Sequence, residues 1–248
     1  MKTSITNEIS GTRGLKFLSG ILMGGLLLGL TACRTTHQVT KGVEESGFLS
    51  DYSQLEKGKK CQADLVYVNQ SADWAKYTKV WIKPVELWHA DDPKSKLGSL
   101  SKEKQQMLVD YLHTSLHEHL SKDYQIVDAA GPDVLVLRCA ITEGKGSKPV
   151  MDLISAVYPA GLVLSYGKQL IWGTGAGVGV TTIEAEILDG QSNQRLAAAV
   201  DRRAGTKALR TKFDGRWGDV KLCFDWWSQR LATVLVELKA GTYGKNEN

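Results

Sequence analysis

Two neighbouring segments of the chain alternate apolar and polar side chains with a period of two. They cover residues 180–188 and 195–203, and between them stand Asp189, Gly190 and the polar residues 191–194. Such alternation is typical of half-buried β-strands, and a short polar connection that contains glycine joins two strands antiparallel. The pair therefore predicts a β-hairpin whose apolar face packs against another layer.

Two longer segments have the period of an amphipathic helix. Residues 101–120 repeat leucine at every fourth position behind Ser101, a suitable N-cap, and residues 218–238 repeat large apolar side chains on one face. The stripes consist of Leu108, Leu112, Leu116 and Leu120 in the first segment, and of Val220, Phe224, Trp227, Leu231, Val234 and Leu238 in the second. We expect both stripes to be buried against the sheet.

Two more strands complete the pattern. Residues 77–87 are rich in β-formers, but Pro84 indicates an edge strand or a bend, whereas residues 133–142 are almost continuously apolar and predict an interior strand. The order strand, helix, strand, apolar insert, strand, strand, helix predicts an α+β fold. We expect a two-layer sandwich, with a small mixed or antiparallel sheet and two main helices on one face.

Two glycine-containing segments resemble nucleotide-binding loops only superficially. Gly173, Gly175, Gly177 and Gly179 follow a period of two, and position 178, where a dinucleotide fingerprint has its last glycine, is valine. Residues 161–168 place five residues between their glycines, and Gln169 stands where a Walker loop has serine or threonine. The first segment is predicted to be a strand, and we expect neither nucleotide nor cofactor.

The N-terminal segment has the features of an export signal. Residues 1–16 carry three basic side chains and one acidic side chain, and residues 17–30 are uncharged and apolar. The residues that follow, Leu30, Thr31, Ala32 and Cys33, resemble the lipobox of bacterial lipoproteins, in which the cysteine receives fatty-acid chains such as palmitate. An ordinary cleaved signal or a short membrane anchor is the alternative. We expect Cys33 to be lipidated and to anchor the protein to the bilayer, and Arg34 in place of aspartate favours the outer membrane, facing the periplasm.

These features predict four regions. They are a lipoprotein signal peptide at 1–32, a lipidated polar tether at 33–58, a single α+β domain at 59–240 and a polar tail at 241–248. Cleavage after residue 32 removes three of the 31 basic and one of the 27 acidic residues, and leaves 28 against 26. A surface so close to neutral gives no reason to expect nucleic acid as a partner.

The sequence offers little for catalysis or metal binding. His113 and His117 are one helical turn apart, but no third ligand accompanies them, so we interpret them as a solvated helix flank. Cys61, Cys139 and Cys223 show no paired spacing and could form at most one disulfide; buried free thiols are the favoured interpretation for Cys139 and Cys223. We expect a protein that is not an enzyme.

Two regions are candidate interaction surfaces. The insert at 151–172 is almost free of charge and is longer than a compact domain needs for a connection, so it predicts either a contact region or a helical hairpin buried over the sheet. Its candidate contact residues are Leu162, Val163, Leu164 and Trp172. Trp226 precedes the core-facing Trp227, and we expect it to be partly exposed as a further interaction surface.

Several stretches resemble a family of bacterial lipoproteins that is known as a domain of unknown function, number 3313. The stretches are SGFLSDYSQL at 46–55, KVWIKPVELW at 79–88, residues 131–142 and, most specifically, IEAEILDGQSNQRLAAAVDRRAG at 183–205. The chain departs from the family pattern only at Gly190 and Asn193 in the turn. The resemblance implies an envelope lipoprotein and supplies no catalytic residue. We expect an accessory or scaffold with a possible protein partner; the alternative is an oligomeric component of a secretion or transport assembly.

Overall fold

The computed structural model describes five stretches of the chain, all within the unit Ala32–Asn248. They are residues 36–39, 45–88, 97–142, 180–205 and 217–245. Within them, no helix is long and apolar enough to cross a membrane.

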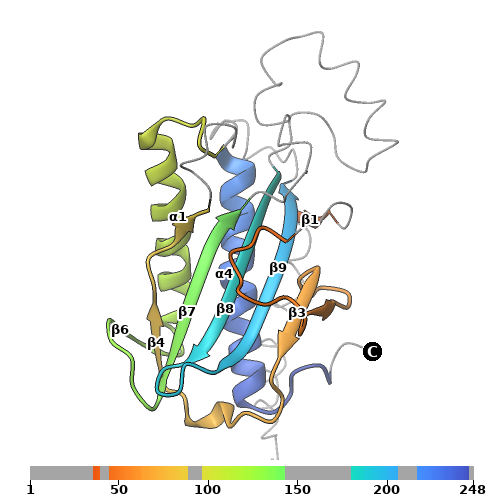
Figure 1. Cartoon of the computed structure of the whole chain (residues 1–248), viewed down its shortest axis with the longest axis vertical. Helices are drawn as coiled ribbons and strands as arrows, with labels where there is room; N and C mark the ends of the chain where they lie inside the picture. Colours follow the sequence, from red (N-terminus) through yellow and green to blue (C-terminus); the bar gives the residue numbers. More distant parts are fainter. Residues whose placement is uncertain (1–35, 40–44, 89–96, 143–179, 206–216, 246–248) are drawn as a thin grey trace, which may run out of the picture. The chain divides into compact units, whose positions relative to one another are not determined.

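A mixed sheet of nine strands forms the centre of the described residues. Its order is β2-β3-β9-β8-β7-β4-β6, with β1 added beside β9 and β5 beside β7 (Figure 1). The strands are β1 (Thr36–Gln38), β2 (Glu56–Lys57), β3 (Leu65–Val68), β4 (Lys79–Ile82), β5 (Glu86–Leu87), β6 (Gln125–Val127), β7 (Val134–Thr142), β8 (Val180–Asp189) and β9 (Arg195–Gly205). Strand β4 runs parallel to β6 and β7, whereas β7, β8 and β9 are antiparallel neighbours. The predicted hairpin and the interior position of β7 are confirmed.

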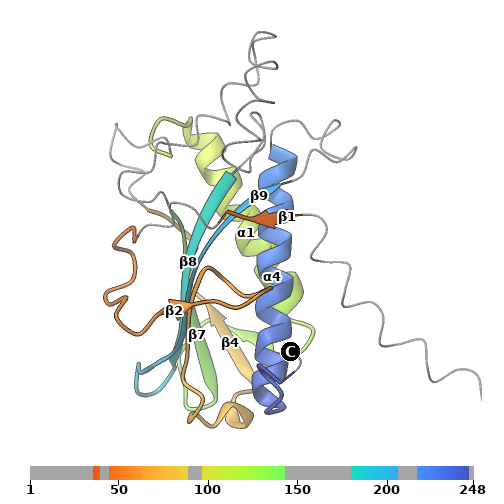
Figure 2. The same cartoon turned by 90° about the vertical axis from the view of Figure 1, so that its right-hand side faces the viewer.

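Two long helices cover one face of this sheet. They are α1 (Lys102–Leu120) and α4 (Trp217–Lys239), which pack against each other as well as against the strands (Figure 2). A short 3-10 helix, η3 (Trp74–Lys76), precedes β4. The helix stripes and the inward positions of β7 and β8 form one core, which confirms the predicted α+β class. Leu108, Leu112, Leu116 and Trp227 are buried as predicted, and Leu231 is half-buried.

The opposite face of the sheet is covered by a segment that the sequence assigns to the tether. Phe48 and Leu49 are buried against Ala140, Ala198 and Val200. Further along the chain towards the N-terminus, β1 is paired with the end of β9. Part of the range 33–58, predicted as a polar tether, thus contacts the sheet: β1 pairs with β9, and Phe48 and Leu49 are apolar side chains within an otherwise polar and turn-rich stretch.

The proline-containing segment also differs from the prediction. Strand β4 lies between β6 and β7, so it is an interior strand and not an edge strand. Pro84 lies in the break between β4 and β5, where the strand predicted over residues 77–87 is interrupted. The partner β6 has only three residues, too few to show a period in the sequence.

The turn between β8 and β9 requires particular residues at positions 190 and 193. A Cβ atom at Gly190 would lie 2.6 Å from the carbonyl oxygen of Gly131 and 2.7 Å from that of Val134, so a side chain cannot fit. Asn193 has a φ of 60°, a left-handed conformation that asparagine tolerates better than most residues. Both residues match what this tight connection requires.

Candidate functional site: an apolar cavity between the sheet and α4

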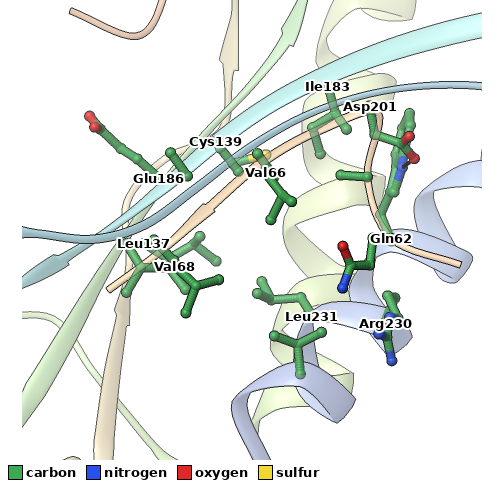
Figure 3. A pocket seen from close by; sticks show the side chains of 18 of the residues that line it. Gln62, Val66, Val68, Leu137, Cys139, Ile183, Glu186, Asp201, Arg230 and Leu231 are labelled. Atoms are coloured by element: carbon green, nitrogen blue, oxygen red, sulfur yellow. Dashed lines mark hydrogen bonds between the residues drawn. The ribbon is translucent and has the colours of Figure 1, made fainter. Parts of the chain in front are cut away.

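An apolar cavity lies between α4 and the strands β3, β9 and β8. Its floor consists of small side chains: Ala185 on β8 is directly opposite Ala199 on β9, and Ala197 is opposite Ile187. All three alanines are half-buried. Because alanine reaches only a short way from the sheet, α4 leaves a volume of about 130 Å³ above the floor (Figure 3).

Larger apolar side chains form the walls of this cavity. Leu231 and Val234 lie on the overlying helix, and both are half-buried, which fits a position beside open space. The other apolar walls are Val66 and Val68 from β3, Leu137 and Cys139 from β7, Ile183 and Ile187 from β8, Leu116 from α1, Trp226, Trp227 and Leu238 from α4, and Tyr243. Helix spacing brings Trp227, Leu231, Val234 and Leu238 over the sheet together.

Polar side chains line the cavity at one end. Figure 3 draws the Gln62 amide and the Arg230 guanidinium at the same end of the cavity. Arg230 Nη1 is 3.6 Å from Glu237 Oε1, in an ion pair in which both side chains keep contact with solvent. The Oε1 atom of Gln62 accepts a hydrogen bond of 3.0 Å from the backbone N–H of Lys59. The cavity thus has an apolar interior and, at this end, the ion-paired guanidinium of Arg230.

The carboxylate of Asp201, which also lines the cavity, is fully engaged. Its Oδ1 accepts hydrogen bonds from Gln38 Nε2 at 2.9 Å and from the backbone N–H of Asp64 at 3.1 Å. Its Oδ2 accepts a hydrogen bond from Trp227 Nε1 at 2.6 Å and lies 3.0 Å from Arg203 Nε in an ion pair. A buried carboxylate is tolerated when it is paired in this way, so Asp201 acts as a structural link between β1, β9 and α4.

A second carboxylate lies beside this cluster. Burial raises the pKa of Asp64 to about 6, and the neighbouring charge of Asp201 adds to that effect. The backbone N–H of Arg202 donates a hydrogen bond of 3.3 Å to Asp64 Oδ2, which favours the charged form but does not outweigh burial. Asp64 therefore changes charge in a pH range in which an exposed aspartate is fully ionised.

Comparison with known proteins shows the family. The model of a protein family described as "Protein of unknown function (DUF3313)" matches residues 44–231, most of the chain. The chain belongs to the DUF3313 family. The matched range includes the segment that covers the outer face of the sheet, both strands of the hairpin and most of α4.

The individual relatives and solved structures that match the chain have low sequence identity to it. The uncharacterized lipoprotein YdcL of Escherichia coli K12 is 27% identical over 181 residues, which are 72% of this chain and 78% of that protein. The PelC dodecamer of Paraburkholderia phytofirmans has 13% identity and a TM-score of 0.36, over 67% of this chain and 96% of that chain. Protein XCC0632 of Xanthomonas campestris has 12% identity and a TM-score of 0.34, over 72% of this chain and 93% of that chain.

The predicted partial exposure of Trp226 is wrong. Trp226 is only 5% exposed, and the Arg203 guanidinium carbon lies 3.2 Å from the centre of its ring. A cation over an indole face is a favourable contact, and here it closes the ring off from solvent. The remaining predicted positions, Cys33, Leu162, Val163, Leu164 and Trp172, lie outside the described residues, as do the four alternating glycines.

The two core thiols agree with the sequence analysis. Cys139 and Cys223 are free and buried, and burial raises the pKa of both thiols. Cys61, in the loop before β3, is half-buried. His113 and His117 lie on α1, half-buried and exposed respectively. Among the described residues no group of three histidine, cysteine, aspartate or glutamate side chains could hold a metal ion.

The outer face of the sheet carries a second polar cluster, which sequence reasoning missed. Glu184 is fully buried and accepts hydrogen bonds from the backbone N–H of Ser46 at 2.9 Å and from Tyr52 Oη at 2.5 Å. Two cations, Arg138 and Arg195, pair with the neighbouring Glu186. The alternation of Glu184 and Glu186 with apolar residues on β8 predicts that one face of the strand is polar. It does not predict that residues 46–52 cover this face. These groups fasten the residues 46–52 to the sheet.

Proposed function

We propose that this protein is a lipid-anchored accessory protein of the bacterial envelope. It is held in the outer membrane, facing the periplasm, by acyl chains on Cys33. The observation that carries the proposal is the sequence Leu30, Thr31, Ala32, Cys33 directly after the uncharged segment 17–30. The similarity to an uncharacterized lipoprotein of Escherichia coli supports it. Acyl chains, at about 0.8 kcal/mol per buried CH₂ group, provide a durable anchor when more than one is attached.

Within the envelope we propose a binding or scaffolding role and not a catalytic one. Three of the buried carboxylates support this role because they are committed to the fold: Asp201 to Trp227 and Arg203, Glu184 to Ser46 and Tyr52, Glu186 to two arginines. A catalytic acid or base needs a position from which it reaches a substrate. The apolar cavity, in contrast, has a volume of about 130 Å³ that the described side chains leave unfilled.

Metabolic labelling with palmitate tests the anchor. Cells that produce the wild-type chain are expected to incorporate the label into it, and density fractionation is expected to place the protein with the outer membrane. Cys33→Ala should abolish labelling and remove the protein from the outer-membrane fraction. Cys61→Ala, a matched change at another cysteine, should leave both properties intact. Labelling of Cys33→Ala at the wild-type level would overturn the proposal.

Crosslinking in living cells separates the two envelope roles. A lone accessory protein is expected to yield the monomer or a 1:1 product with another protein. A ladder of multiples of the monomer mass would instead indicate the oligomeric component of a secretion or transport assembly.

A further inference from the structure

We propose that the cavity over Ala185, Ala197 and Ala199 is a binding site for a short-chain alkyl carboxylate, with the alkyl chain on the alanine floor and the carboxylate at Arg230. This inference goes beyond the envelope role proposed above, because it assigns a ligand class to the folded body and does not depend on the lipid anchor.

In the part of the chain that the structure describes, the cavity occurs only on the face of β8 and β9 that α4 covers. Ala198, between two floor residues, points to the other face, where it is 4% exposed, and Ala140 on β7 is 0% exposed there. The floor alanines on the same strands are half-buried although α4 lies over them. Protein interiors are normally packed without voids larger than a water molecule. The sheet therefore has small side chains at the positions where the helix stands off from it.

The size and lining of the cavity fit a single short hydrocarbon chain. Its volume of about 130 Å³ is close to the ~150 Å³ of an engineered apolar cavity that binds benzene, a molecule of six carbons. Valine, leucine and isoleucine side chains and the two indole rings form the walls. Transfer of an alkyl chain from water into such a lining is favourable in proportion to the apolar area removed from water.

The charge of Arg230, whose side chain keeps contact with solvent, selects the head group. Arg230 brings a guanidinium to the border of the cavity, where it forms an ion pair with Glu237 at 3.6 Å that is in reach of water, and a ligand carboxylate can add to the contacts that the guanidinium already makes. Guanidinium binds carboxylate through two parallel hydrogen bonds. The negative charge of Asp201 is compensated by Arg203 and by the Trp227 indole, so it does not repel an incoming anion as a bare carboxylate would.

The test uses the full chain, as purified from membranes into nanodiscs, and a water-soluble probe, hexanoate with a terminal trifluoromethyl group, followed by fluorine NMR. Empty nanodiscs provide the blank. We expect saturable binding that unlabelled hexanoate displaces, that hexan-1-ol displaces less well, and that hexyltrimethylammonium does not displace.

Four variants locate the probe. Ala199→Leu fills the floor and should weaken binding by at least about tenfold, whereas the same change at the exposed Ala240 should have no effect. Leu231→Ala enlarges the cavity and should shift the preference from hexanoate towards octanoate by about tenfold. Arg230→Gln should weaken hexanoate by about tenfold and leave hexan-1-ol unchanged.

Circular dichroism checks that each variant is folded. If Ala199→Leu does not fold, the chain-length shift in Leu231→Ala and the head-group effect in Arg230→Gln decide. The proposal is overturned if no saturable binding exceeds the blank, or if Leu231→Ala leaves the chain-length preference unchanged. It is also overturned if hexan-1-ol binds as well as hexanoate and Arg230→Gln does not change the affinity for hexanoate.

Discussion

The indole Nε1 of Trp227 donates a hydrogen bond of 2.6 Å to Oδ2 of Asp201, and thereby joins the middle of α4 to β9. Both residues are buried, with 7% and 2% of their surface exposed. The other oxygen of the same carboxylate holds Gln38 of β1, so one side chain connects the N-terminal strand, the hairpin and the closing helix.

Removal of the indole N–H is the first test of this link. Trp227→Phe keeps most of the apolar contact but leaves Asp201 without one of its buried donors, so the free energy of unfolding should fall by about 1–3 kcal/mol. Trp227→Ala also creates a void and should cost about 3–5 kcal/mol. Val236→Ala, at an exposed site on the same helix, is the control and should stay within about 0.5 kcal/mol of wild type. Urea midpoints measure all three; equal values for wild type and Trp227→Phe would contradict the link.

The second prediction concerns the pH dependence that Asp64 introduces. Its pKa is raised from the ordinary 3.8 to about 6 in the folded protein. The folded chain therefore holds a proton that the unfolded chain has already released, so this stabilising contribution is present below pH 3.8 and is lost as the pH rises to about 6. Asp64→Asn should remove that loss, which is on the order of 1 kcal/mol.

The measurement for Asp64 is the difference between the free energies of unfolding of Asp64→Asn and wild type. This difference should increase in favour of the variant between pH 4 and pH 7. Asparagine still offers an oxygen to the backbone N–H of Arg202, so the comparison isolates the charge. Parallel pH profiles for the two proteins would show that Asp64 does not titrate differently in the folded state.

The third prediction concerns Asp189, at the end of β8. Burial by itself would raise the pKa of this carboxyl, but hydrogen bonds from Lys76, Tyr77 and Ser192 outweigh it and hold the pKa well below its usual range. The distances are 2.8 Å to Lys76 Nζ, 2.6 Å to Tyr77 Oη and 2.7 Å to Ser192 N. Asp189→Ala leaves the buried Tyr77 hydroxyl without its acceptor and should destabilise the protein by about 2–4 kcal/mol.

The control for Asp189 is Lys76→Met, because the Lys76 side chain is 42% exposed and its ion pair should contribute at most about 1 kcal/mol. A carboxyl with a lowered pKa stabilises the folded state above its ordinary pKa and loses that effect as the pH falls. The advantage of wild type over Asp189→Ala should therefore shrink in acid. An advantage that grows as the pH falls below 4 would contradict the assignment.

The fourth prediction concerns thiol reactivity. Burial raises the pKa of the Cys139 and Cys223 thiols, so the nucleophilic thiolate is scarce and out of reach of reagents. Iodoacetamide should modify Cys61 first and the two core thiols at least about tenfold more slowly, until denaturant is added. Peptide mass spectrometry reports each site separately. Fast modification of Cys223 in the folded protein would mean that α4 does not pack on the sheet as described.

Periodicity predicted the elements that are long enough to repeat it. Residues 101–120, 133–142 and 218–238 match α1, β7 and α4 to within a residue at either end. Strands β1 and β6 have three residues each and acquire their identity from their partners β9 and β4, which no local pattern reveals. Phe48 and Leu49 lie in a polar stretch of the sequence. They are buried because they pack on the face of the sheet that the helices do not cover, and the local sequence does not reveal this contact.

The candidate site was harder to predict from the sequence than the long elements, for a related reason. The run of Ala197, Ala198 and Ala199 is a visible signal for a hollow in a strand, but only the register shows that two of them face α4. Trp226 and Trp227 are adjacent on a helix and cannot share one stripe, which suggested that one is exposed. The ring of Trp226 is covered by Arg203 on strand β9, and the separation of the two residues in the sequence conceals such a contact.

The position of β1 has a consequence for how far the protein can extend from its membrane. Thr36, the first residue of β1, is three positions after Cys33, and an extended chain advances at most ~3.6 Å per residue, or about 11 Å over this stretch. If Cys33 carries the acyl chains proposed above, the edge at which β1 meets Arg203, Ala204 and Gly205 lies within this distance of the lipidated residue. So short a connection would keep this edge of the sheet close to the membrane surface.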